Sequence, residues 1–113
     1  MVLNLKDIKK KTFELTLIDG TTLSIKKPNE DILEAMEEFE LGLQNVSKVK
    51  DVFCRIKDLT LTIMNRNTQG KIIDKSFFDQ RDEDGELIYD YSVCMAIFTE
   101  YSKFSREVLT NPN

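Results

Sequence analysis

The chain has 113 residues, of which 41% are hydrophobic and 32% charged, and this composition suits one small globular domain. Sixteen Lys and Arg against 20 Asp and Glu give a net charge of −4. Such a balance argues against nucleic acid as a partner, because that binding needs cations to neutralise phosphates. The chain also has no apolar run of roughly 18 residues and no signal-peptide pattern, so we expect a cytoplasmic protein without a membrane partner.

The N-terminal part of the chain has the pattern of β-structure. Residues 2–5 indicate a weak strand, and residues 12–26 predict a β-hairpin, because apolar and polar residues alternate on both sides of Asp19-Gly20. Gly20 tolerates the positive φ that tight turns require. Pro28 ends the second strand, since proline cannot donate a backbone hydrogen bond.

Three amphipathic helices are predicted after the hairpin, at about 30–43, 47–65 and 87–109. Asn29 is a suitable N-cap for the first, and Asp74 can cap a short helix that runs through residue 80. We therefore predict one α+β domain over residues 1–113, in which a β-hairpin region (1–27) packs on a mainly helical region (28–113) of three principal helices. We expect the core to include Leu15, Ile25, Ile32, Met36, Phe39, Val52, Phe53, Ile56, Ile97, Phe98, Tyr101 and Phe104.

Cysteine usage points to a reducing compartment. Cys54 and Cys94 both lie in apolar, helix-like stretches. A disulfide framework in a small secreted protein normally uses more cysteines. We therefore expect two reduced, buried thiols.

The residues needed for common catalytic and metal sites are missing or badly spaced. The chain has no histidine, which excludes Ser-His and Cys-His nucleophile pairs and most zinc sites. Its four glycines are too far apart for a phosphate-binding loop. Residues 80–85 resemble the start of a calcium loop, but Gln80 is a poor first ligand and Tyr91 stands where a bidentate Glu is needed. We expect no catalytic residue, cofactor or metal, although counting carboxylates leaves acid-base chemistry by a carboxylate pair open.

Charge is distributed in blocks along the chain. Residues 28–45 hold six acidic residues and no basic one, residues 46–75 are net basic, and residues 76–91 are net acidic. Blocks of this kind occur as ordinary solvated faces, and they also suit contacts with a partner or a second copy of the chain.

The last predicted helix carries the candidate partner-binding residues. Phe98, Tyr101 and Phe104 recur at a spacing of three and so share a face, and Lys103 directly precedes Phe104. The simpler interpretation is core packing. The alternative is a docking stripe for an amphipathic partner helix or for self-association.

Several motifs, taken in order and spacing, resemble one protein family. They are the hairpin with Asp19-Gly20, then Ile25-Lys26-Lys27-Pro28 running into an acidic helix, then Ile63-Met64-Asn65-Arg66-Asn67-Thr68-Gln69-Gly70-Lys71-Ile72-Ile73, then Ala96-Ile97-Phe98-Thr99-Glu100-Tyr101-Ser102-Lys103-Phe104, and finally Asn111-Pro112-Asn113. Together they resemble the small tail assembly chaperones of long-tailed (siphovirus-type) bacteriophages and prophages of Gram-positive bacteria. The acidic segment 79–90 departs from that pattern.

The resemblance implies a non-catalytic protein of the host cell cytoplasm. Family members bind the tape-measure protein, keep it soluble, help to recruit tail-tube subunits, and are absent from the finished virion. A longer form commonly arises by ribosomal frameshifting, and this chain would be the short form. The alternatives are a structural or adaptor component of a phage particle and a small regulatory, antitoxin-like binding module.

Overall fold

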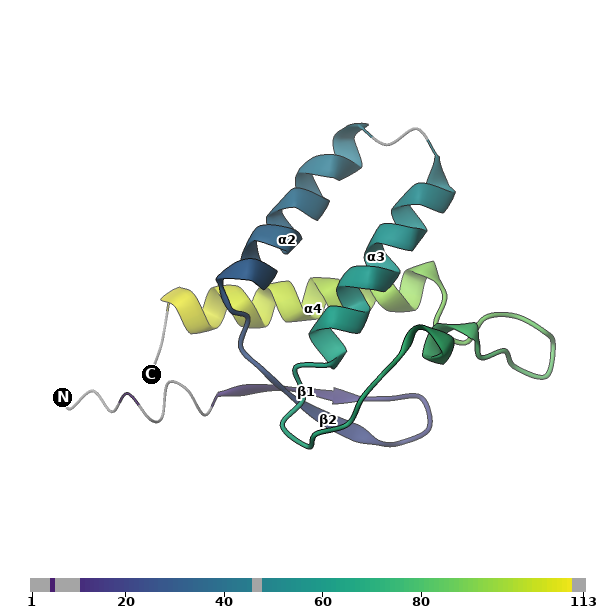
Figure 1. The fold of residues 1–113 in the computed structure, drawn as a ribbon, viewed down its shortest axis with the longest axis horizontal. Helices are drawn as coiled ribbons and strands as arrows, with labels where there is room; N and C mark the ends of the chain where they lie inside the picture. Colours follow the sequence, from purple (N-terminus) through teal and green to yellow (C-terminus); the bar gives the residue numbers. More distant parts are fainter. Residues whose placement is uncertain (1–4, 6–10, 46–47, 111–113) are drawn as a thin grey trace.

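The computed structural model describes residue 5, residues 11–45 and residues 48–110 (Figure 1). These residues form an α+β fold, a β-hairpin followed by a mainly helical part, as predicted. Of the weak strand predicted at residues 2–5, only Leu5 lies within the described residues, and it is helical and exposed. The elements in chain order are β1 (Thr12–Thr16), β2 (Thr22–Lys26), α2 (Glu30–Gly42), η1 (Leu43–Asn45), α3 (Val49–Met64), η2 (Lys75–Asp79) and α4 (Tyr91–Thr110).

The β-hairpin pairs β1 and β2 antiparallel within the predicted range of 12–26. Its connection is a five-residue loop rather than a two-residue turn. The Leu17 N–H donates to the Thr21 carbonyl at 2.7 Å, and the Asp19 carboxylate accepts from the Thr21 N–H at 2.9 Å. Gly20 lies at φ +92°, a conformation that favours glycine, and this explains the Asp-Gly signal in the sequence.

The outer edge of β2 is covered by the turn that follows α3. The Thr68 N–H donates to the Ser24 carbonyl at 2.8 Å. The side-chain amide of Gln69 then continues the pairing, accepting from the Ser24 N–H at 3.1 Å and donating to the Thr22 carbonyl at 3.0 Å. A side chain therefore takes the place of a third strand at this edge.

Local capping signals mark where the helices begin. Asn29 caps α2 by accepting from the Ile32 N–H at 2.9 Å, as predicted. The prediction for the second helix began at residue 47, but residues 46–47 lie outside the described part, and α3 is described from Val49. The short predicted helix after Asp74 is the 3-10 helix η2, capped by that carboxylate at the Ser76 N–H.

The third principal helix starts later than predicted, at Tyr91 instead of about residue 87. Asp90 is its cap, since the Asp90 carboxylate accepts from the Val93 N–H at 3.0 Å. The preceding residues are held by other contacts: the Ile88 N–H donates to the Gln80 carbonyl at 3.0 Å. Residues 87–90 therefore do not continue the helix, because Leu87 and Ile88 pair with Arg81 and Gln80 across the acidic loop, residues 82–86.

The helices α2 and α3 and the hairpin pack around α4. Figure 1 shows α2 and α3 side by side; α3 crosses α4, the lower end of α2 reaches α4, and the β-hairpin lies along the lower side of α4. Ring contacts join these parts: Phe39 of α2 meets Phe98 of α4 at a centroid distance of 5.1 Å, and Phe13 of β1 meets Tyr101 at 5.5 Å. The core therefore extends from the hairpin through α4 to α2.

Most of the predicted core residues are buried. Ile25, Ile56 and Tyr101 are fully buried, but Cys54, which we expected to be buried, is exposed, and only Cys94 is buried. Cys54 lies on the outer side of α3, where the helical period places it away from Ile56. Both thiols are free. The predicted core positions that are only half-buried are Leu15, Val52, Phe53 and Phe104. Further buried apolar residues are Leu17, Leu23, Leu59, Ile63, Met64, Phe78, Tyr89 and Val108.

Candidate functional site

The aromatic face of α4, for which core packing was the simpler interpretation and a docking stripe the alternative, belongs largely to the core. Phe98 is 4% exposed and Tyr101 is fully buried. The Tyr101 hydroxyl donates to the Lys26 carbonyl at 2.7 Å, and burial raises the pKa of this hydroxyl to about 12. These two side chains therefore hold α4 against the hairpin and α2, and they are not on the surface.

The other two predicted partner-binding residues do not form a docking face with them. Phe104 is half-buried and packs against Phe13 at a centroid distance of 5.7 Å. Lys103 is exposed, and its ammonium pairs with the Glu100 carboxylate at 3.3 Å. Two exposed charges of this kind contribute little stability. Phe98, Tyr101, Lys103 and Phe104 are thus divided between core and surface, and they do not share one exposed face.

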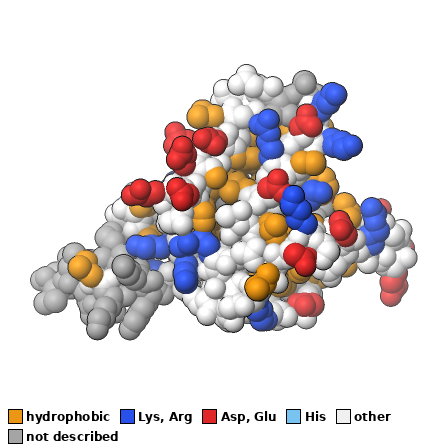
Figure 2. Space-filling view, viewed as in Figure 1, with side chains coloured by type: hydrophobic (Ala, Val, Ile, Leu, Met, Phe, Trp, Pro, Cys, Tyr) orange, Lys and Arg blue, Asp and Glu red, His pale blue; other side chains and the backbone are white. Residues whose placement is uncertain are grey.

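An uncovered apolar hollow lies instead between α2 and α3. We call it the α2–α3 groove; its volume is about 470 Å³. Figure 2 shows hydrophobic side chains along this hollow, with acidic side chains gathered on the α2 side. The groove is lined by Asp31, Ile32, Ala35, Glu38, Phe39, Arg55, Asp58, Leu59 and Thr62.

The groove exists because α4 supports both helices from behind. The rings of Phe39 and Phe98 meet beneath it at a centroid distance of 5.1 Å. They close the groove on the side of α4, and its opposite side is open to solvent. At its upper end the Arg55 guanidinium reaches across to α2, and a Cβ added at Gly42 would lie 3.0 Å from the Arg55 Nη1. The floor is thus apolar, and one end is bounded by a cation.

Apolar side chains are also exposed where α2 ends and α3 begins. We call Leu41, Leu43 and Val49 the apolar tip; their exposed fractions are 59%, 37% and 77%. Figure 1 places this end of the helix pair far from the β-hairpin. Surface apolar residues scattered singly are ordinary, whereas contiguous apolar patches often mark interaction surfaces.

The groove separates an acidic side from a mixed side. All six acidic residues of α2 are exposed, and among the described residues none of them forms an ion pair. The other side carries Arg55 and Asp58. An unneutralised acidic rim favours a partner with basic residues beside its apolar ones.

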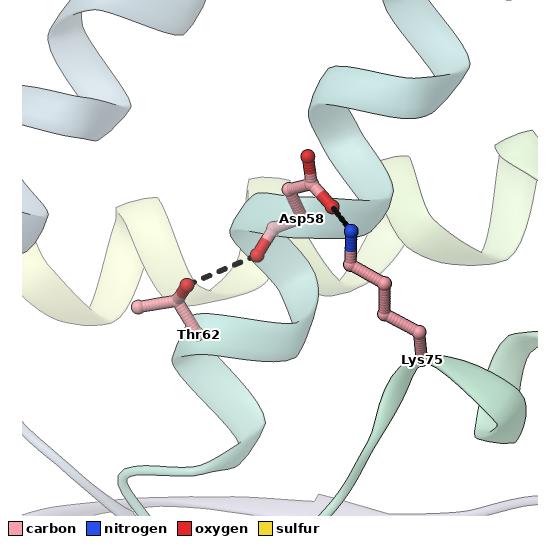
Figure 3. A network of polar contacts seen from close by, with 3 residues as sticks. All are labelled: Asp58, Thr62 and Lys75. Atoms are coloured by element: carbon pink, nitrogen blue, oxygen red, sulfur yellow. Dashed lines mark hydrogen bonds and ion pairs between the residues drawn. The ribbon is translucent and has the colours of Figure 1, made fainter.

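A smaller pocket of about 250 Å³ lies on the other side of α3, against η2. Its rim includes an ion pair between the Lys75 ammonium and the Asp58 carboxylate at 3.8 Å (Figure 3). The Thr62 hydroxyl donates to the Asp58 carbonyl at 3.0 Å. Asp58 therefore lies between the pocket and the α2–α3 groove. The pocket is lined by Cys54, Lys57, Asp58, Leu61, Lys75, Phe78 and Asp79.

The acidic loop has the geometry of a turn. The Asp82 carboxylate accepts from the backbone N–H groups of Asp84 and Glu86, at 2.9 and 3.0 Å. Within residues 11–45 and 48–110, no three side chains of the metal-binding types gather closely enough to hold an ion. In that same part of the chain, no helix has the length and apolar character needed to cross a membrane.

The comparison with known proteins found no relative: no protein-family model, curated protein or solved structure matches the chain.

Proposed function

We propose that this protein is a non-catalytic phage tail assembly chaperone. It binds the tape-measure protein in the host cell cytoplasm, keeps it soluble, helps to recruit tail-tube subunits, and is absent from the finished virion. The family resemblance of the sequence motifs supports this proposal. The observation that carries it is the α2–α3 groove, an open hollow with an apolar floor, together with the exposed apolar residues of the apolar tip.

The shape of the groove suits a helical partner. Its lining runs from residue 31 to residue 39 of α2, which is roughly 12 Å along a helix axis. A hollow between two helices accepts the apolar ridge of a third helix. Ala35 is half-buried and leaves space for a large partner side chain. The acidic rim selects partner helices that carry Lys or Arg beside that ridge.

The contact needed for a chaperone is short and reversible. A very long helical protein made alone exposes more apolar surface than a soluble chain tolerates. Many small domains, each covering a short stretch, give high avidity from weak individual contacts. Tube subunits can then displace them one at a time, because no single groove holds the partner tightly.

The proposal is tested by co-expressing the chain with the tape-measure protein of its own phage. We expect the wild-type chain to keep that protein in the soluble fraction, and the double variant Leu41→Lys/Val49→Asp to fail. Each replacement suits its helix end electrostatically, so folding is preserved. Ala35→Gln, which fills the groove, should fail too.

Leu109→Asp is the matched control, because Leu109 is a similarly exposed leucine, 64% exposed, at the far end of α4. It should act like the wild type. If the tape-measure protein is equally insoluble with and without the wild-type chain, and no complex is recovered at low salt, the proposal is wrong.

A further inference from the structure

Among the described residues, the β1 edge of the hairpin has no further strand paired to it. On β2, Ser24 directs its N–H and C=O away from β1, to the turn that follows α3. The direction of the backbone N–H and C=O groups alternates along a strand. Phe13 and Leu15 therefore direct these groups to β2, where they pair with Ile25 and Leu23. Glu14 between them therefore points its N–H and C=O outward.

No other described backbone or side chain bonds to these outward groups of Glu14. An edge of this kind is a template for an added strand.

A hollow of about 330 Å³ lies directly beside this edge, between β1 and α4. We call it the β1–α4 groove. Its apolar wall would receive the inward side chains of an added strand. Glu14 and Glu100 also contribute to its lining. The Glu14 carboxylate accepts hydrogen bonds from the Ser24 and Thr12 hydroxyls, which lower its pKa. The Glu100 carboxylate pairs with the Lys103 ammonium. The lining is Phe13, Glu14, Leu15, Ala96, Ile97 and Glu100.

A complementary segment is found elsewhere in the same chain, at residues 71–73. Asn67 bonds through its amide to both the N–H and the C=O of Lys71, at 2.9 and 2.8 Å. Asn65 does the same for Ile73, at 2.8 Å for both bonds. Two amides thus hold alternate residues from one side, which is the pairing pattern of a strand edge. Ile72 lies between them, so in an extended segment its own N–H and C=O point away from the two asparagines. Ile72 is 90% exposed.

We propose that residues 71–73 of one copy add as a short strand to the β1 edge of a second copy, with Ile72 seated in the β1–α4 groove. The alternation of side chains is consistent with this pairing. With the added strand parallel to β1, Ile72 faces α4 and Lys71 faces the opposite side of the sheet, where the Glu14 carboxylate lies. The occupant is therefore matched in both apolar character and charge.

The contact is heterologous, because each copy contributes a different surface. A pair of copies then retains one free edge and one free segment, so further copies can add head to tail. The inference does not rest on the proposed function, since it requires only the purified chain. It also gives a reason for the nearly complete exposure of a large aliphatic residue.

Sedimentation equilibrium of the purified chain over a range of concentrations tests the inference. We expect the wild type to associate at low salt, and Ile72→Asp or Ala96→Arg to weaken association at least about tenfold, as expected when a large aliphatic side chain is no longer buried. Both positions are exposed, so neither change should affect folding. Glu14→Pro, which removes the outward N–H, should act in the same way, and Leu109→Asp should not.

Mixing two variants distinguishes this contact from a symmetric one. Ile72→Asp retains an intact groove and Ala96→Arg retains an intact segment. An equimolar mixture should therefore form a one-to-one complex although each variant alone is monomeric. The inference is wrong if the wild type is monomeric. It is also wrong if Ile72→Asp or Ala96→Arg associates as strongly as the wild type, or if the mixture stays monomeric.

Discussion

Two serines on the buried side of α4 show how differently a hydroxyl can be satisfied. The Ser105 hydroxyl donates to the Tyr101 carbonyl at 2.7 Å, whereas the Ser102 hydroxyl is buried without a hydrogen-bond partner among the described residues. Alanine is the better helix former and carries no group to satisfy. We predict that Ser102→Ala raises the free energy of unfolding by about 0.5–1 kcal/mol in urea denaturation.

Ser105→Ala is the control on the same helix. It also gains helix propensity but loses an existing bond, so its stability should change less or fall. Equal losses of stability for Ser102→Ala and Ser105→Ala would contradict the prediction.

Two buried groups predict a loss of stability at alkaline pH. Burial raises the pKa of the Cys94 thiol from 9.0 to about 11 and that of Tyr101 from 10.0 to about 12. The folded state therefore keeps protons that the unfolded state releases, so their contribution is complete below pH 9 and is lost as pH rises towards 12.

Tyr101→Phe should be less stable at neutral pH, because the Lys26 carbonyl loses its donor. Its stability should, however, fall less steeply above pH 10. Denaturant unfolding at several pH values measures both effects, and parallel curves for the variant and the wild type would exclude the role of Tyr101.

At the scale of residues, the sequence pattern identified core character better than function. Periodicity placed Phe98 and Tyr101 on one helix face, and that face is buried. It could not tell a docking stripe from a core stripe, because both have the same spacing. Cys54 was wrongly expected to be buried because its apolar neighbours were counted without regard to the face it occupies.

Among the secondary-structure elements, the turn after α3 depends on Asn67. This side chain is 7% exposed, and its amide bonds to the Met64 and Lys71 carbonyls and to the N–H groups of Gln69 and Lys71. We predict that Asn67→Ala lowers the free energy of unfolding by about 2 kcal/mol, because buried backbone groups lose their partners.

Asn65→Ala is the comparison. Asn65 is exposed, and among the described residues its side chain hydrogen-bonds to the Ile73 backbone alone. Water can replace those bonds, so the loss should be smaller. Thermal unfolding measures both variants, and an equal or larger loss for Asn65→Ala would show that Asn67 does not organise the turn.

Elements with local signals were predicted well, and those fixed by distant contacts were not. The hairpin and the start of α2 follow from strand alternation and from the Asn29 cap. The start of α4 was misplaced because residues 87–90 are held by the far side of the acidic loop. The pairing of β2 with the Gln69 amide had no sequence signal, since it joins residues more than forty positions apart.

For the molecule as a whole, the arrangement of helices created a surface that the sequence pattern did not reveal. The apolar stripes of α2 and α3 were predicted, but their separation depends on α4 lying beneath both. The groove is a product of that packing. The acidic block at residues 28–45, by contrast, was visible in the sequence and forms the exposed acidic side of α2.

That acidic side predicts salt-dependent partner binding. Exposed charges are screened beyond about 10 Å at 0.1 M salt, so the complex with the tape-measure protein should weaken as salt rises. Glu34→Gln/Glu37→Gln, which neutralises two exposed carboxylates, should flatten that dependence. A titration of binding against salt measures it. An unchanged slope would show that the acidic side of α2 does not face the partner.

Site-specific photo-crosslinking tests most directly whether the partner occupies the α2–α3 groove. A photoreactive residue is placed at Ala35 in the groove or, separately, at Thr99, which is exposed on α4. Each chain is then co-expressed with the tape-measure protein and irradiated. We predict crosslinks from position 35 and few or none from position 99. Crosslinks from position 99 with none from position 35 would contradict the assignment of the groove as the binding surface.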